Sequence, residues 1–146
     1  IWGNHSPTMY PDFENIMVDG SPGKDLINDM SWVENEFLPV VQQRGKAVID
    51  SRGASSATSA AKAAIDTVMA CERPTLSGDC FSAAVISDGS YDLPEGIICG
   101  MPLMTTPDGK VEIVRDITLS DLAKEKIKIS TDELIEERSA VEDLLT

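Results

Sequence analysis

A helical period dominates the hydrophobic pattern that follows residue 31. Ser31 and Glu34 have the spacing of a capping box, which predicts that a helix begins at Trp32. Pro39 predicts a kink or a break before the helix ends near Ile49. The apolar residues of this stretch recur three, four or seven positions apart and predict one buried face: Val33, Phe37, Val40, Val41, Ala47 and Val48.

The strongest helical stretch is the alanine-rich segment 57–71, which follows a helix end at Arg52-Gly53. Its many small side chains suit close packing. We therefore expect one face of this helix to be buried against a sheet or against a partner subunit.

From residue 80 onward the pattern predicts strands, at residues 80–87, 97–106 and 110–116. The links between them are short and contain Asp-Gly turns, which favours antiparallel pairing. Residues 8–19 form a shorter, irregular strand region. Two acidic helices are predicted to finish the chain, one from about Ser120 and one from Ser130.

The order of these elements predicts an α+β fold, an antiparallel sheet with packed helices. No predicted strand leads into a G-x-G-x-x-G turn, so the doubly wound nucleotide-binding domain is not expected in this chain. The length of 146 residues suits one domain, residues 1–146.

Charge and hydropathy narrow the function classes. The chain has 25 Asp and Glu against 12 Lys and Arg, a formal charge of −13, which argues against a nucleic-acid or membrane-surface partner because both need clustered cations. No apolar run approaches the roughly 20 residues that span a bilayer. Three cysteines without C-x-x-C spacing predict thiols rather than a zinc or disulfide framework.

His5 is the one histidine, and it lies in a polar loop after the apolar residues Ile1 and Trp2. An imidazole can act as an acid or a base near neutral pH, although an isolated histidine is usually an ordinary surface or core residue. No metal-ligand set is predicted. Ser6, Ser55 and Ser56 lack a nucleophile motif, which leaves a hydrolase as a minor alternative.

Five short segments, in order along the chain, share one resemblance. They are residues 1–6 (IWGNHS), 41–49 (VQQRGKAVI), 55–63 (SSATSAAKA), 85–89 (VISDG) and 132–137 (DELIEE). Together they resemble the cytosolic branch of the malate dehydrogenases, in the lactate/malate dehydrogenase family. Asn4 and Gln42-Gln43 favour malate over lactate within that family.

The resemblance implies the C-terminal catalytic half of an enzyme of the tricarboxylic acid cycle that oxidises (S)-malate to oxaloacetate with NAD, as a cytoplasmic homodimer. It implies that His5 transfers the proton and that Ser56 contacts the substrate near the nicotinamide. Because Ser56 precedes a helix, a purely capping role is the alternative.

The same resemblance implies that the NAD-binding domain, the substrate-binding arginines and the aspartate partner of His5 lie upstream of Ile1. We therefore expect the fragment alone to be inactive, and the choice between NAD and NADP stays open. Two other functions remain: a lactate or other 2-hydroxy-acid dehydrogenase of the family, and a non-catalytic dimerisation or regulatory module that retains the fold.

Overall fold

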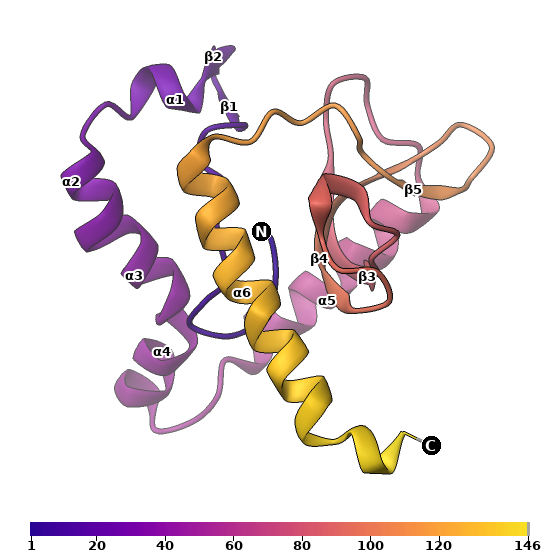
Figure 1. Ribbon diagram of the computed structural model, residues 1–146. Helices are drawn as coiled ribbons and strands as arrows, with labels where there is room; N and C mark the ends of the chain where they lie inside the picture. The colour runs from indigo at the N-terminus through magenta and orange to yellow at the C-terminus, as the bar shows by residue number, and fades with distance from the viewer. Residues whose placement is uncertain (146) are drawn as a thin grey trace.

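A three-stranded antiparallel sheet forms one side of the fold (Figure 1). Its strands are β3 (Phe81–Ile86), β4 (Ile98–Thr105) and β5 (Val111–Ile113), in the order β3-β4-β5. The register pairs Phe81 with Leu103, and Leu103 in turn with Ile113. The predicted strands and their antiparallel pairing are confirmed, with each strand two to four residues shorter than expected. The computed structural model describes residues 1–145.

Short helices make up much of the first half, and they lie together on the left of Figure 1. Two short strands, β1 and β2, form a hairpin before them. The elements in chain order are β1 (Met17–Val18), β2 (Ser21–Pro22), α1 (Gly23–Leu26), α2 (Met30–Trp32), η1 (Val33–Phe37), α3 (Leu38–Gln42) and α4 (Arg44–Arg52).

The helical start predicted from Ser31 and Glu34 is wrong by two residues. Asp29 is the N-cap, and its carboxylate accepts a hydrogen bond from the Trp32 amide at 3.0 Å. Aspartate is as good a cap as serine, so the earlier of two possible caps is used.

The break expected at Pro39 occurs instead at Gln43, between α3 and α4. One turn of π-helix, η1, directly precedes α3, which contains Pro39. The regular α-helical hydrogen bonds are already interrupted in that turn, so the missing N–H of proline does not end the helix there. The predicted helix end is confirmed, since Gly53 follows α4 with φ of +68°, a left-handed conformation that glycine adopts without strain.

The alanine-rich segment forms α5 (Ala57–Glu72), as predicted. It packs on β3 and β4, and the Thr105 hydroxyl donates to the Ala70 carbonyl at 2.7 Å near the end of the helix. However, no residue of α5 is buried, and Ile65 and Val68 are 59% and 63% exposed. The expected burial against the sheet is therefore wrong, because the sheet covers too little of the helix; burial against a partner subunit stays a prediction.

The chain ends with one long helix, α6 (Asp121–Ala140), and the short η3 (Glu142–Leu144). Ser120 caps α6 as predicted, accepting from the Ala123 amide at 3.1 Å. The second helix predicted from Ser130 is wrong. Residues 126–129 contain no Gly or Pro that would end the first helix, and Ser130 is fully buried within it.

The N-terminal segment joins the sheet and fills the core. Gly3 pairs with Gly100 of β4 through two backbone hydrogen bonds of 3.0 and 2.7 Å. Trp2 pairs with Tyr10, and its ring meets Tyr91 edge-on at 4.9 Å. The largest fully buried apolar side chains come from both halves of the chain: Trp2, Tyr10, Val33, Met101, Leu103 and Ile127. The backbone of Gly3, from which the next loop begins, is therefore held in place by the sheet.

No helix within residues 1–145 is both long enough and apolar enough to cross a bilayer.

Candidate active site

The loop that carries His5 begins at Gly3, whose backbone touches α6. Gly3 has φ of +85°, and a Cβ added there would lie 2.2 Å from the Ser130 hydroxyl oxygen. Only glycine fits such an approach in this conformation. The loop backbone can therefore rest directly on the helix.

Ser130 binds the loop at two points. Its hydroxyl oxygen accepts a hydrogen bond from the Asn4 backbone amide at 2.8 Å and lies at hydrogen-bond distance, 3.0 Å, from the Thr8 hydroxyl oxygen. Ser130 has no exposed surface, so these bonds are shielded from water. They tie both ends of the loop to one side chain of α6.

Glu133, one turn further along α6, is the main acceptor for the loop side chains. Its Oε2 accepts hydrogen bonds from the Ser6 hydroxyl at 2.5 Å, from the Thr8 hydroxyl at 2.6 Å and from the side-chain amide of Asn4 at 3.1 Å. The Asn4 amide group also donates to Glu137 Oε1 at 3.1 Å. These bonds favour the ionised form, and the Ser6 bond above all holds the pKa of Glu133 below its ordinary value.

The role of these α6 residues was not predicted from the sequence. Ser130 and Glu133 have capping-box spacing, and that local interpretation concealed the contact with the loop. Ser130, Glu133 and Glu137 also fall at i, i+3 and i+7, which places them on one helix face. That periodic polar face was the available signal.

His5 lies between Asn4 and Ser6, and its side chain is exposed. The imidazole makes no hydrogen bond to any residue from 1 to 145. A ring fixed through its neighbours yet free at both nitrogens can exchange a proton with a group brought to the surface.

Ser56 lies at the start of α5 and is partly exposed. Its hydroxyl does not cap the helix, although its carbonyl accepts hydrogen bonds from the Ala60 amide at 3.1 Å and the Ser59 hydroxyl at 3.4 Å. The purely capping alternative is therefore wrong. No hydrogen bond joins Ser56 to His5 within the described chain, and the two residues belong to different elements.

The hydrolase alternative receives no support at Ser6. The Ser6 hydroxyl is bonded to Glu133 and to Thr8, not to an imidazole. A serine nucleophile requires a base that takes its proton and a group that orients the base. The arrangement makes Ser6 a structural part of the loop.

The described residues do not form a dinucleotide site. The sheets are antiparallel, and no helix follows a parallel strand through a glycine-rich turn. Within residues 1–145 no three His, Cys, Asp or Glu side chains gather as a metal site, and Cys71, Cys80 and Cys99 are free thiols.

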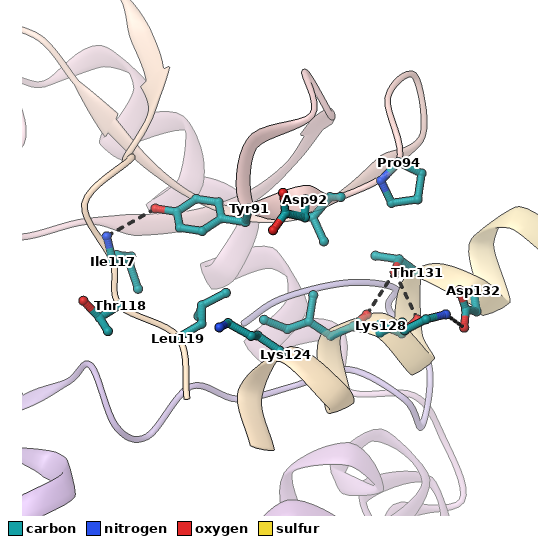
Figure 2. Close-up of a pocket in the computed structure, with 12 residues that line it drawn as sticks. Tyr91, Asp92, Pro94, Ile117, Thr118, Leu119, Lys124, Lys128, Thr131 and Asp132 are labelled. Atoms are coloured by element: carbon teal, nitrogen blue, oxygen red, sulfur yellow. Dashed lines mark hydrogen bonds and ion pairs between the residues drawn. The ribbon is translucent and has the colours of Figure 1, made fainter. Parts of the chain in front are cut away.

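A pocket of about 500 Å³ lies apart from the His5 loop, between α6 and the residues around η2 (Ser90–Asp92). Figure 2 shows side chains from three segments around it: Tyr91, Asp92, Leu93, Pro94, Ile117, Thr118, Leu119, Lys124, Ile127, Lys128, Thr131 and Asp132. Lys128 on its rim is paired with Asp132 at 2.5 Å. Neither His5 nor Ser56 lines this pocket.

Known proteins resemble this chain over almost all of its length. The family model for the lactate/malate dehydrogenase alpha/beta C-terminal domain matches residues 1–144. Malate dehydrogenases from Magnetococcus marinus and Cutibacterium acnes are 49% and 48% identical, over 99% of this chain and 44% and 43% of their own length. The chain thus spans less than half the length of these relatives.

Solved structures show the same fold. A malate dehydrogenase from Naegleria fowleri is 42% identical with a TM-score of 0.88, over 98% of this chain and 43% of that one. A Trichomonas vaginalis lactate dehydrogenase, solved with NADH and oxamate, is 25% identical with a TM-score of 0.87, over 99% and 45%. The sequence and the fold agree, and the chain belongs to the lactate/malate dehydrogenase family, as its C-terminal α/β domain.

Proposed function

We propose that this chain is the catalytic C-terminal part of an NAD-dependent malate dehydrogenase, which interconverts (S)-malate and oxaloacetate. The observation that carries the proposal is the His5 loop, in which an unpaired, exposed imidazole is held between two residues bonded to Glu133. Both curated relatives named above are malate dehydrogenases, which favours malate over lactate.

His5 transfers the proton of the reaction. In malate oxidation the neutral imidazole accepts the proton of the substrate hydroxyl, and in oxaloacetate reduction the imidazolium returns it. The nicotinamide, when bound, supplies the hydride chemistry. The exposure of His5 supports this role, because its ring nitrogens have no competing partner among residues 1–145.

The remaining parts of the site come from the section of the relatives that this chain does not match. The chain lacks a glycine-rich turn for the pyrophosphate, and its formal charge of −13 is poorly suited to holding a dicarboxylate. The arginines that bind the substrate carboxylates and the aspartate that orients His5 therefore belong to the N-terminal part of the full enzyme. NAD is the proposed cofactor, and NADP is the alternative that the N-terminal part decides.

Ser56 contacts the substrate near the nicotinamide in this proposal. Its hydroxyl makes no bond to the helix that it precedes, and the first turn of α5 offers amides to an anion. The side chain is thus available to a ligand.

The full enzyme is proposed to be a cytoplasmic homodimer in which α5 contributes to the subunit interface. The support is the helix itself, whose small and apolar residues are exposed along most of its length: Ala57, Ala60, Ala61, Ala64, Ile65 and Val68. Small side chains permit a second helix to approach closely.

Replacing His5 by Asn in the full-length enzyme tests the proposal. Turnover of malate and of oxaloacetate is expected to fall about 10²- to 10⁴-fold, the usual contribution of a general acid or base. Lactate should be a poor substrate of the unmodified enzyme. Near-normal turnover by the variant, or a preference for lactate, would overturn the assignment.

A further inference from the structure

Three side chains of the His5 loop converge on one carboxylate of α6. Asn4, Ser6 and Thr8 each donate a hydrogen bond to Glu133 Oε2, at 3.1, 2.5 and 2.6 Å. Asn4 and Ser6 are the residues immediately before and after His5. The side chains on both sides of the histidine are therefore bonded to the same oxygen atom.

The imidazole itself has no such attachment, since it is exposed and forms no hydrogen bond within residues 1–145. Where its nitrogens lie thus depends on the backbone that carries it. Glu133 holds that backbone indirectly, through the side chains of Asn4 and Ser6. Ser130 holds it directly, through the backbone amide of Asn4. Of the two neighbours of His5, Ser130 binds only Asn4, whereas Glu133 is the acceptor that both neighbours share.

A carboxylate suits this place better than any neutral group. Glu133 Oε2 accepts three hydrogen bonds and donates none, which an ionised carboxylate can do. An amide in its place would carry no charge, so its carbonyl oxygen would accept the same donors more weakly, and its NH₂ group, if turned toward the loop, would face the NH₂ group of Asn4. The three attachments of the loop would then weaken.

We propose that Glu133 is a positioning residue for proton transfer: its carboxylate fixes the Asn4-His5-Ser6 backbone and so places the imidazole. This inference rests on the proposed function, because it assumes that His5 moves the proton. Glu133 does not contact the substrate in this account. It acts only through His5.

A double-mutant cycle in the full-length enzyme tests this dependence. Glu133→Gln alone is expected to lower kcat about 10- to 100-fold, because a displacement near 1 Å can cost that much in rate, while the KM for NADH stays unchanged. In a His5→Asn background the same substitution should cost less than about twofold, since a residue that acts through His5 has nothing left to position.

Glu136→Gln is the matched control, because Glu136 lies on the same helix, is exposed and has no bonding partner in residues 1–145. It should leave kcat unchanged in both backgrounds. If Glu133→Gln fails to fold, as judged by its melting curve, Ser6→Ala removes one attachment beside His5 and completes the same cycle.

The outcomes separate the two proposals. If His5→Asn keeps near-normal turnover, the proposed function fails. If His5→Asn abolishes turnover but Glu133→Gln, or Ser6→Ala in its place, has no effect, the positioning role alone is overturned. An equal loss in both backgrounds also overturns it, because a merely structural residue would reduce both enzymes by the same factor.

Discussion

The backbone of Gly3 lies directly against the side chain of Ser130, so that a Cβ on Gly3 would lie 2.2 Å from the serine Oγ and 2.6 Å from its Cβ. Residues from the two ends of the chain thus meet at the point where the histidine loop begins. The contact depends on the absence of a side chain at position 3.

Gly3→Ala is therefore expected to destabilise the protein by at least about 2 kcal/mol, combining the strain of a left-handed alanine with overpacking against Ser130. Gly20 is the matched control, since its φ of +81° is similar but nothing lies within 4 Å of its added Cβ. Gly20→Ala should show the strain alone. Urea unfolding of both variants measures the difference, and equal losses would show that the Ser130 contact costs nothing.

Ser56→Ala is expected to raise the KM of the full enzyme for malate without changing its stability. The hydroxyl does not cap α5, so its removal costs the helix no hydrogen bond, whereas loss of a capping hydroxyl would cost about 1 kcal/mol. Thermal melting and steady-state kinetics together check this. A lower melting temperature with normal KM would restore the capping role.

Asp88 provides a prediction of pH dependence. The pKa of Asp88 is lowered from 3.8 to about 2, first by the hydrogen bond from the Ser90 hydroxyl and then by the hydrogen bond from Arg115. Because the folded pKa is lowered, the stabilisation is fully present above the unfolded pKa of 3.8 and is lost as the pH falls toward 2.

A carbon-13 NMR titration of the Asp88 carboxyl group should show this midpoint. Ser90→Ala should move it upward by more than Arg115→Gln does, since the hydroxyl bond contributes most. A midpoint near 3.8 in the unmodified protein would contradict the hydrogen bonding at this turn.

Ala61→Trp tests the role of α5 in assembly. Ala61 is exposed in this chain, so the fold of the domain should tolerate the larger ring, with a change in stability within about 0.5 kcal/mol. In the full enzyme the same substitution should separate the proposed dimer. Sedimentation velocity measures this, and an unchanged dimer would place the interface elsewhere.

The 146-residue chain by itself is expected neither to bind NADH at micromolar concentration nor to oxidise malate. Without fixed cations and an oriented substrate, a histidine forfeits the proximity effect, which can reach roughly 7–11 kcal/mol of the barrier. Calorimetric titration with NADH and a spectrophotometric assay check this. Robust oxaloacetate-dependent oxidation of NADH would mean that this chain supplies more of the active site than we propose.

Much of the fold could be predicted from local patterns. The alternation along β3 and the alanine content of α5 correspond to real elements, because burial on one face and helix propensity act over a few residues. Element boundaries were less predictable. Asp29 and Ser31 are both good caps, and nothing local decides between them.

The candidate site was only half predictable for the same reason. His5 and Ser56 were proposed as site residues from short segments, and their roles stay predictions, whereas the attachment of the loop to Glu133 joins opposite ends of the chain. Capping-box spacing at Ser130 and Glu133 explained both residues locally, and the polar face that they share with Glu137 does not say which distant segment it contacts. Burial of Ser130 inside a continuous helix resolves the choice.

The N-terminal segment is attached to α6 near the middle of the helix and again at its N-cap. Glu133 holds the loop at Ser6, and Ser120, which caps the same helix, donates a hydrogen bond to Glu14 at 2.5 Å. The two attachment points are about 20 Å apart along a helix that rises 1.5 Å per residue. α6 therefore holds the N-terminal segment rigidly along its length, and any tilt of the helix would move the histidine loop with it as one body.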